Sequence, residues 1–401
     1  MVFITTWRAQ ALFAALALYG LLSAPAPPAV RLVEAAIGAL LVVCVGIERP
    51  LMAATGHALR STALPPWESV GTAAFVWLLW APLVRGLTLG WEPEAIVRDV
   101  VPLVYLFLPV LLVPLLRCAG PQAVPLLATG LTLAGVLFVL RWWRHTEWGF
   151  DTVGARAMGD GTRYFLNAPS VLFAAVVLPM TSLSLMARGG WWRWVLAFAL
   201  LVPAALCLGA LAGAVHRMAL GVMLLAFLAT VPWWWRRAPW ALAWAAVLAA
   251  SGAALFSDVA LGALELVAEK NRLTGASARV EEAMAVLEQA GRSLPALLFG
   301  DGWGALIANP AVGGWRVAYT HTLLSYALLK AGVLGVLALT AYLAGLVPGA
   351  LALLRANPPL AAAVLAPLSV ALSAHTSFKY LDCGLLLTLM VLAAEKAEHK
   401  G

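Results

Sequence analysis

The chain has few charged residues for its length. Of its 401 residues, 11% are charged and 63% are hydrophobic, and its mean hydropathy is +0.91. No soluble domain of this size has so few charges, so the composition indicates a polytopic helical membrane protein. A membrane barrel is excluded too, because barrel strands alternate polar and apolar residues and the apolar runs here are continuous. We expect an all-α fold that forms one integral membrane domain over residues 1–401.

Cysteines and metal-binding motifs are also scarce. The four cysteines lie far apart in or beside apolar runs, which is typical of small core residues (Cys44, Cys118, Cys207 and Cys383). No Asp-Asp or His-Glu cluster has metal-ligand spacing, so we expect no cofactor and a reaction without a metal. The net charge of +7 gives no case for a nucleic-acid partner, but it suits anionic lipids and an anionic substrate.

Long apolar runs, in contrast, are numerous in this chain. A membrane-spanning helix needs about twenty apolar residues, and on that basis the sequence predicts about twelve spans. They lie near residues 9–24, 30–47, 69–84, 99–116, 122–140, 166–187, 193–212, 215–232, 239–256, 320–346, 358–375 and 379–394. An even number of spans places both termini on the same side of the membrane.

Basic residues in the short turns orient these spans. They follow the sixth and eighth spans and close the chain (Arg188, Arg193, Arg236, Arg237, Lys396 and Lys400). Under the positive-inside rule these turns and both termini are cytoplasmic. The loops near 141–165 and 257–319 then face the periplasm of a bacterial inner membrane. Their many basic residues are either ordinary solvated charges or the lining of a chamber for an anionic, lipid-linked substrate.

The loop at 257–319 is expected to form a periplasmic subdomain between the ninth and tenth spans. Asp258 can cap one short helix, and Ser277 can cap a second, with Val280, Met284 and Leu287 at helical spacing. Such helices are typical of a membrane surface. The glycine-rich run at 300–304 predicts a tight turn after them, which lets the loop fold back.

Two arginines stand out as possible anion ligands. Arg217 opens the eighth span, where a guanidinium is costly unless it meets an anion, lines a wet cavity or extends to the interface. Arg279 lies in the first turn of the helix that Ser277 caps. It can bind an anion or form a weak surface pair with Glu282 three residues on.

His321 is the third candidate, at the start of the tenth span. Thr320 can cap that helix and place His321 in its first turn, where the helix dipole and nearby arginines disfavour an imidazolium. A neutral imidazole can accept a proton from a sugar hydroxyl. The alternatives are a histidine satisfied at the interface, or an acidic base such as Asp301 or Glu265. Two arginines beside a base suit loss of a lipid diphosphate, because guanidinium forks bind phosphate oxygens.

Several short motifs resemble one family in their order and spacing. The run HTLLSYALLKAGVLG at 321–335 is similar to the histidine-and-glycine signature of the bacterial O-antigen ligase and O-antigen polymerase superfamily. The run LFGDGWG at 298–304 resembles its glycine turn, and SAR at 277–279 its loop-helix start. Arg217 and Asn167 resemble the arginine and asparagine of two of its spans. The chain departs from the pattern of this superfamily at four positions. The superfamily commonly has serine, glycine, asparagine and an acidic residue where this chain has His216, Ala278, Thr322 and Lys330, respectively.

The resemblance implies a GT-C-like membrane glycosyltransferase whose active site faces the periplasm. It would move a glycan, with inversion, from undecaprenyl diphosphate to a sugar hydroxyl of lipid A-core. By resemblance, His321 would activate or position the acceptor, and Arg217 and Arg279 would hold the diphosphate. Further contacts to diphosphate or glycan are expected from Arg156, Arg163, Asn167, Arg272 and Lys330.

Other functions stay open at this point. A polymerase would instead join two lipid-linked repeat units, and a related enzyme would glycosylate a protein. A transporter or lipid flippase would explain the many spans and the intramembrane Lys330, but it should show paired halves with broken helices. A purely structural scaffold would not need Arg217 at membrane depth.

Overall fold

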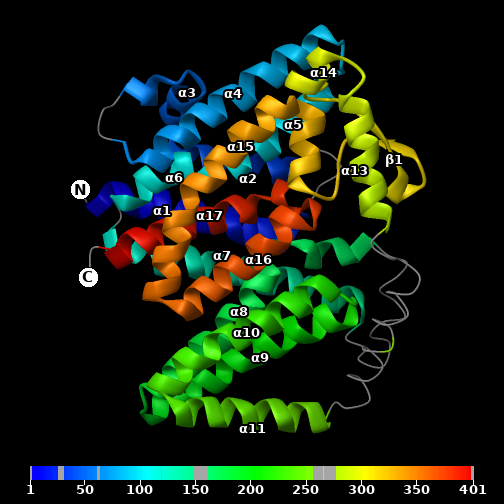
Figure 1. The fold of residues 1–401 in the computed structure, drawn as a ribbon. Helices are drawn as coiled ribbons and strands as arrows, with labels where there is room; N and C mark the ends of the chain where they lie inside the picture. Colours follow the sequence, from blue (N-terminus) through cyan, green and yellow to red (C-terminus); the bar gives the residue numbers. More distant parts are fainter. Residues whose placement is uncertain are drawn as a thin grey trace.

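The computed structural model describes residues 2–25, 31–60, 64–118, 120–147, 161–255 and 277–398, together with Glu265. In these ranges the chain is a helical bundle with one short hairpin of strands (Figure 1). The first helices are α1 (Val2–Leu22), α2 (Leu32–Val45), α3 (Glu48–Ala54), α4 (Pro66–Thr88), α5 (Pro93–Leu106), α6 (Leu108–Arg117), α7 (Ala123–His145) and α8 (Pro169–Ala187).

The remaining elements include the hairpin. The helices are α9 (Trp191–Gly213), α10 (Arg217–Arg237), α11 (Pro239–Leu255), α13 (Ser277–Ala290), α14 (Leu294–Phe299), α15 (Leu323–Ala356), α16 (Pro358–Ser373) and α17 (Leu381–Glu398). The antiparallel strands are β1 (Ile307–Asn309) and β2 (Trp315–Val317). Short 3₁₀ turns are η1 (His57–Arg60), η2 (Gly120–Gln122), η4 (Gly161–Asn167), η5 (Pro310–Val312) and η6 (Thr376–Lys379).

The predicted class, an all-α membrane protein, is confirmed. Among the described residues, six helices are long and apolar enough to cross a membrane, namely α4, α7, α8, α9, α10 and α15. The bent pair α5–α6 would make a seventh. Each of the twelve predicted apolar runs overlaps one helix or this pair. The number of crossings remains a prediction, because the other runs form helices too short or too charged to qualify by themselves.

The chain ends and the loop region lie at opposite ends of the bundle. Figure 1 shows both termini at the left, whereas α13 and the hairpin are at the right. Helix α17 runs through the middle, where it packs against α5, α6, α7, α15 and α16. Its buried Asp382 accepts a hydrogen bond of 2.8 Å from the backbone N–H of Ser170, at the start of α8. The carboxylate thus satisfies a donor that a helix start leaves free.

A bend of 40° at Phe107 separates α5 from α6. Pro109 lacks the N–H that would donate to the carbonyl of Tyr105, so the helix is interrupted there. Gly384 of α17 lies directly against that carbonyl, where a larger residue would not fit. The break therefore coincides with a close helix–helix approach and belongs to the packing of the bundle.

The glycine-rich turn at 300–304 fits between α4 and α15. Pro82 in α4 has no N–H for the carbonyl of Leu78, and the indole Nε1 of Trp303 donates to that oxygen at 3.1 Å. The backbone N–H of Trp303 donates to the carbonyl of Pro82 at 3.0 Å. A proline in a membrane helix thus supplies the acceptors that hold the loop in place.

A matching interruption occurs in α15 at Gly332, whose φ of 66° is not helical. The carbonyls of Leu329 and Lys330 accept hydrogen bonds of 2.9 and 3.0 Å from the backbone N–H groups of Asp301 and Gly302. The turn therefore joins two helices and fixes the N-terminal part of α15. The prediction that this turn lets the loop fold back onto the helices agrees with its position.

Replacing Gly302 with alanine is expected to cost about 2–4 kcal/mol of stability. Gly302 has a φ of 81°, and a Cβ there would overlap the backbone of Gly86 in α4. Gly90→Ala is the matched control, because Gly90 has a φ of 74° but open space around its Cα. The control should cost only about 1 kcal/mol. Unfolding curves in detergent micelles test the difference, and equal losses would refute the packing argument.

Candidate active site

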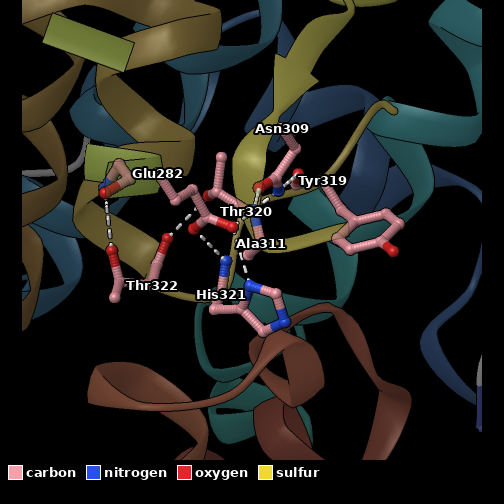
Figure 2. A network of polar contacts seen from close by, with 8 residues as sticks. Glu282, Asn309, Ala311, Tyr319, Thr320, His321 and Thr322 are labelled. Carbon is pink, nitrogen blue, oxygen red and sulfur yellow. Dashed lines mark hydrogen bonds and ion pairs between the residues drawn. The ribbon is translucent and has the colours of Figure 1, made fainter. Parts of the chain in front are cut away.

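Glu282 and His321 form an acid–imidazole pair at the N-terminal end of α15. Glu282 lies on α13 with only 1% of its surface exposed, and His321 stands two residues before α15 begins. The imidazole Nδ1 is 2.7 Å from Oε2 of Glu282, and the backbone N–H of His321 donates to Oε1 at 2.7 Å (Figure 2). Two contacts from one carboxylate fix both the ring and the backbone of His321.

Asn309 of β1 completes this arrangement. Its side-chain Nδ2 donates to Oε2 of Glu282 at 2.6 Å, while its Oδ1 accepts from the N–H of Ala311 at 2.9 Å. Burial raises the pKa of Glu282, but hydrogen bonds from His321 and Asn309 outweigh burial and hold it below its usual value. The stability that these hydrogen bonds contribute is therefore present at neutral pH. It is lost only as the pH falls through the lowered pKa of Glu282.

The ionised Glu282 determines how His321 can react. A carboxylate only accepts hydrogen bonds, so Nδ1 of His321 carries the proton and Nε2 is left as an acceptor in the neutral ring. A carboxylate in this place orients a histidine base and stabilises the imidazolium that forms when the base takes a proton. The side chain of His321 is 25% exposed, so a substrate can reach it.

The cap of α15 differs from the prediction by two residues. Thr322, not Thr320, caps the helix, and its hydroxyl accepts from the N–H of Ser325 at 3.1 Å. Thr320 is buried and donates to the carbonyl of Thr322 at 3.0 Å. His321 therefore lies just before the helix instead of in its first turn. Its orientation comes mainly from Glu282, a partner 39 positions away in sequence.

A second histidine pair lies close by. The rings of His216 and His375 are 6.2 Å apart, and Nε2 of His216 is 2.8 Å from Oδ1 of Asn167. Burial, and then the electrostatic influence of His216, His321 and Arg279, lowers the pKa of His375 to about 3. His375 is therefore neutral at neutral pH. The ring contact and the hydrogen bond place Asn167, His216 and His375 in one region, and the charge of Arg279 and the imidazole of His321 influence the same ring.

This region brings together four of the eight predicted site residues, namely Asn167, Arg217, Arg279 and His321. Arg279 is exposed on α13, and Arg217 directly follows His216 at the start of α10. Asn167 reaches the region through its contact with His216. Arg163 belongs to η4, but its side chain is not among those that the structure describes. Arg156 and Arg272 lie wholly outside the described residues. Those three predictions stay untested.

Lys330 takes a different position from the one predicted for a substrate ligand. It is fully buried, in contact with the carboxylate of Asp99, and its Nζ donates to the carbonyl of Ala305 at 2.6 Å. Asp99 also accepts from the N–H of Gly304 at 2.8 Å and from the hydroxyl of Tyr326 at 3.0 Å. The ammonium thus anchors the glycine-rich turn to α5 and α15, and it does not line a space open to a substrate.

One further basic residue, Lys379, was not singled out by the sequence. Lys379 of η6 lies 3.9 Å from the ring centre of Tyr326, and its Nζ donates to the carbonyl of Ala318 at 3.3 Å. Burial lowers its pKa to about 7; Asp99 opposes this shift, and Lys330 and Arg98 add to it. Since Ala318 precedes His321 by three residues, Lys379 supports the segment that carries the histidine.

Glu282 is the main residue whose role the sequence did not reveal. It was predicted only as a possible partner of Arg279, but its side chain faces inward and binds His321. The helix predicted from Ser277 is confirmed, yet Val280, Met284 and Leu287 are 62%, 61% and 52% exposed. The predicted apolar stripe therefore faces away from the described chain. The buried side carries Val286, which packs against Ile307 and Leu329, beside Glu282, which Asn309 and His321 satisfy.

The site has the parts of a base-assisted transfer to a hydroxyl group. Within the described ranges, no three His, Cys, Asp or Glu side chains are arranged to hold a metal ion, and a metal-free reaction remains a prediction. The chemistry available is an oriented imidazole beside several cations. Comparisons with models of protein families and with the curated proteins find no match to this chain.

Proposed function

We propose that this protein is a membrane glycosyltransferase that moves a glycan from undecaprenyl diphosphate to a sugar hydroxyl of lipid A-core. The observation that carries the proposal is the Glu282–His321 pair, which is set among cations at the outer end of a bundle of apolar helices. A lipid-linked donor needs a site at the membrane boundary. A diphosphate leaving group needs positive charge, and a hydroxyl acceptor needs a base.

In this reaction His321 and Glu282 act on the acceptor. Nε2 of His321 takes the proton of the attacking hydroxyl, and Glu282 stabilises the imidazolium through Nδ1. The hydroxyl oxygen bonds to the anomeric carbon from the face opposite the leaving group, so the configuration inverts. The bond between that carbon and the diphosphate oxygen breaks, and undecaprenyl diphosphate leaves with the electron pair.

Arg217, Arg279 and Lys379 are the groups we assign to the diphosphate. Each lies beside a member of the histidine cluster or the segment that carries His321. Guanidinium forks can contact two phosphate oxygens at once and so stabilise the charge that develops as the bond breaks. Asn167 orients His216 beside them.

The proposed topology has twelve spans in a GT-C-like arrangement, with cytoplasmic termini and a periplasmic site. It is supported by the twelve apolar runs, the basic turns and the position of α13 opposite the termini (Figure 1). The feature that best favoured a transporter, Lys330, is paired with Asp99 in a structural network. A transport pathway is not needed to account for it.

The proposal is tested with purified protein in nanodiscs, supplied with an undecaprenyl-diphosphate-linked glycan and lipid A-core. The expected result is a glycosylated lipid A-core and one undecaprenyl diphosphate per transfer. Product that forms with the donor alone and grows by repeat units would identify a polymerase instead. In cells that lack their own ligase or polymerase, restored lipopolysaccharide ladders distinguish the same two activities. No product in either system would refute the proposed function.

Arg279→Lys is expected to lower kcat/KM for the donor by roughly tenfold to hundredfold. Lysine keeps the charge but loses the two-pronged contact with phosphate oxygens. Arg355→Lys is the matched control, because Arg355 lies at the other end of α15 and should tolerate the change. Transfer rates with varied donor measure the effect. Equal activity of Arg279→Lys and wild type would show that charge alone suffices and that the fork has no role.

A further inference from the structure

A hollow lies along α13, at Gln289, seven residues after Glu282. It has a volume of about 370 Å³ and is bordered by α13, the hairpin and the connection between α4 and α5. Its polar lining comes from Trp91, Gln289, Arg292, Asp301 and Arg316. The reaction proposed above uses none of these side chains.

Hydrogen bonds fix the inner wall of this cavity. Gln289 is 8% exposed, and its Nε2 donates to Oδ2 of Asp301 at 2.7 Å and to the carbonyl of Leu306 at 3.2 Å. The indole Nε1 of Trp91 donates to the carbonyl of Asp301 at 2.8 Å. The amide oxygen of Gln289, the carboxylate of Asp301 and the face of Trp91 are therefore held in place. Pre-oriented polar groups beside an aromatic ring suit the hydroxyls and apolar face of a sugar.

The rim of the cavity is positively charged. Arg292 follows the end of α13, and Arg316 lies on β2 directly across from Ala308 of β1. Both side chains are exposed, and within the described part of the chain neither forms an ion pair. Two guanidinium groups thus face one carboxylate, that of Asp301, which already accepts from Gln289. This excess of charge favours an anionic ligand.

We propose that this cavity binds an anionic sugar, one that bears a phosphate or a carboxylate, as part of the acceptor glycan. The inference rests on the proposed function and names a second contact region for its acceptor. Gln289 follows Glu282 by seven residues on α13, which is two helical turns or about 10 Å. A short oligosaccharide can span that distance, with its anionic sugar in the cavity and its reacting hydroxyl at His321.

Direct binding tests the site without any transfer reaction. Radiolabelled glucose 6-phosphate is equilibrated with the full-length protein in nanodiscs, and glucose and inorganic phosphate serve as competitors. We expect each competitor to bind at least about tenfold more weakly than the sugar phosphate. The double variant R292A/R316A should lose at least about tenfold in affinity, whereas R279A should bind as wild type does. Thermal unfolding checks that the double variant is folded.

Three binding results would overturn the inference. Phosphate that competes as well as glucose 6-phosphate would reduce the cavity to a simple anion site. Loss of binding in R279A, but not in R292A/R316A, would place the sugar phosphate at the candidate active site. Absence of binding to wild type would leave the cavity without the proposed ligand.

Transfer kinetics give a second, separate readout. R292A/R316A should raise KM for a phosphorylated acceptor by at least about tenfold with kcat unchanged, and should leave KM for the dephosphorylated acceptor unchanged. A fall in kcat, or an equal rise in KM for both acceptors, would contradict a role in recognising the anion. Failure of the proposed function would appear as absence of transfer by wild type, while the binding experiment would still report on the cavity.

Discussion

Replacing His321 with alanine is expected to lower the rate of glycan transfer by about 10²–10⁴-fold, because the variant loses its general base. Stability should fall by about 1–3 kcal/mol, because Glu282 loses the hydrogen bond from Nδ1, but the fold should persist. The imidazole is partly exposed, and the backbone N–H that donates to Glu282 remains in the variant. Initial rates with saturating donor and acceptor measure the effect, and thermal unfolding in detergent checks the fold.

The controls separate this role from a general need for histidine. Glu282→Gln should also lower the rate strongly, because a neutral amide does not stabilise the imidazolium. His57→Ala, at an exposed histidine in η1, should leave the rate unchanged. If His321→Ala transfers glycan at the wild-type rate, the catalytic assignment is wrong and an acidic base such as Asp301 becomes the better candidate.

Replacing Asp99 with alanine is expected to have the largest effect on stability, a loss of about 3–5 kcal/mol. The substitution leaves the ammonium of Lys330 buried without its counter-charge, and it removes the acceptor for Gly304 and Tyr326. The double variant Asp99→Leu/Lys330→Met should recover part of the loss, because an apolar pair leaves no buried charge. Unfolding curves of the single and double variants give the coupling between the two residues.

The single variant Lys330→Met decides between two roles for this lysine. The network around Asp99 predicts a less stable protein whose folded fraction still transfers glycan, because Lys330 is fully buried. Wild-type stability combined with loss of transfer would show that Lys330 acts on the substrate, as its resemblance-based assignment implied. Measuring both quantities on the same preparation makes the outcomes distinguishable.

The sequence predicted the helices better than their polar contacts. Each apolar run overlaps a helix because the length and hydrophobicity of a run are local properties. The bend at Phe107 and the role of Pro82 were not predicted, although both depend on prolines visible in the sequence. A proline shows where a helix loses a hydrogen bond, but not which distant group uses the freed carbonyl.

The site was predicted in part. Arg279 and His321 both act on His375, and Arg217 directly follows His216 of the same cluster, while their roles remain predictions. Glu282 was missed because i,i+3 spacing on a helix suggests pairing with Arg279, whereas the buried carboxylate finds a stronger partner across the fold. Lys330 was placed by membrane depth alone, which cannot identify a counter-charge 231 positions away.

By itself, the sequence determined the class of the protein, the positions of its apolar helices and the loop that carries the candidate site. Only the tertiary structure decided which side of α13 is buried, which carboxylate orients His321, and that Lys330 is an anchor for the loop. The physical reason is that apolar burial depends on composition along a segment, which any sequence displays. The partner of a buried polar group depends on which segments meet, and that is a property of the whole fold.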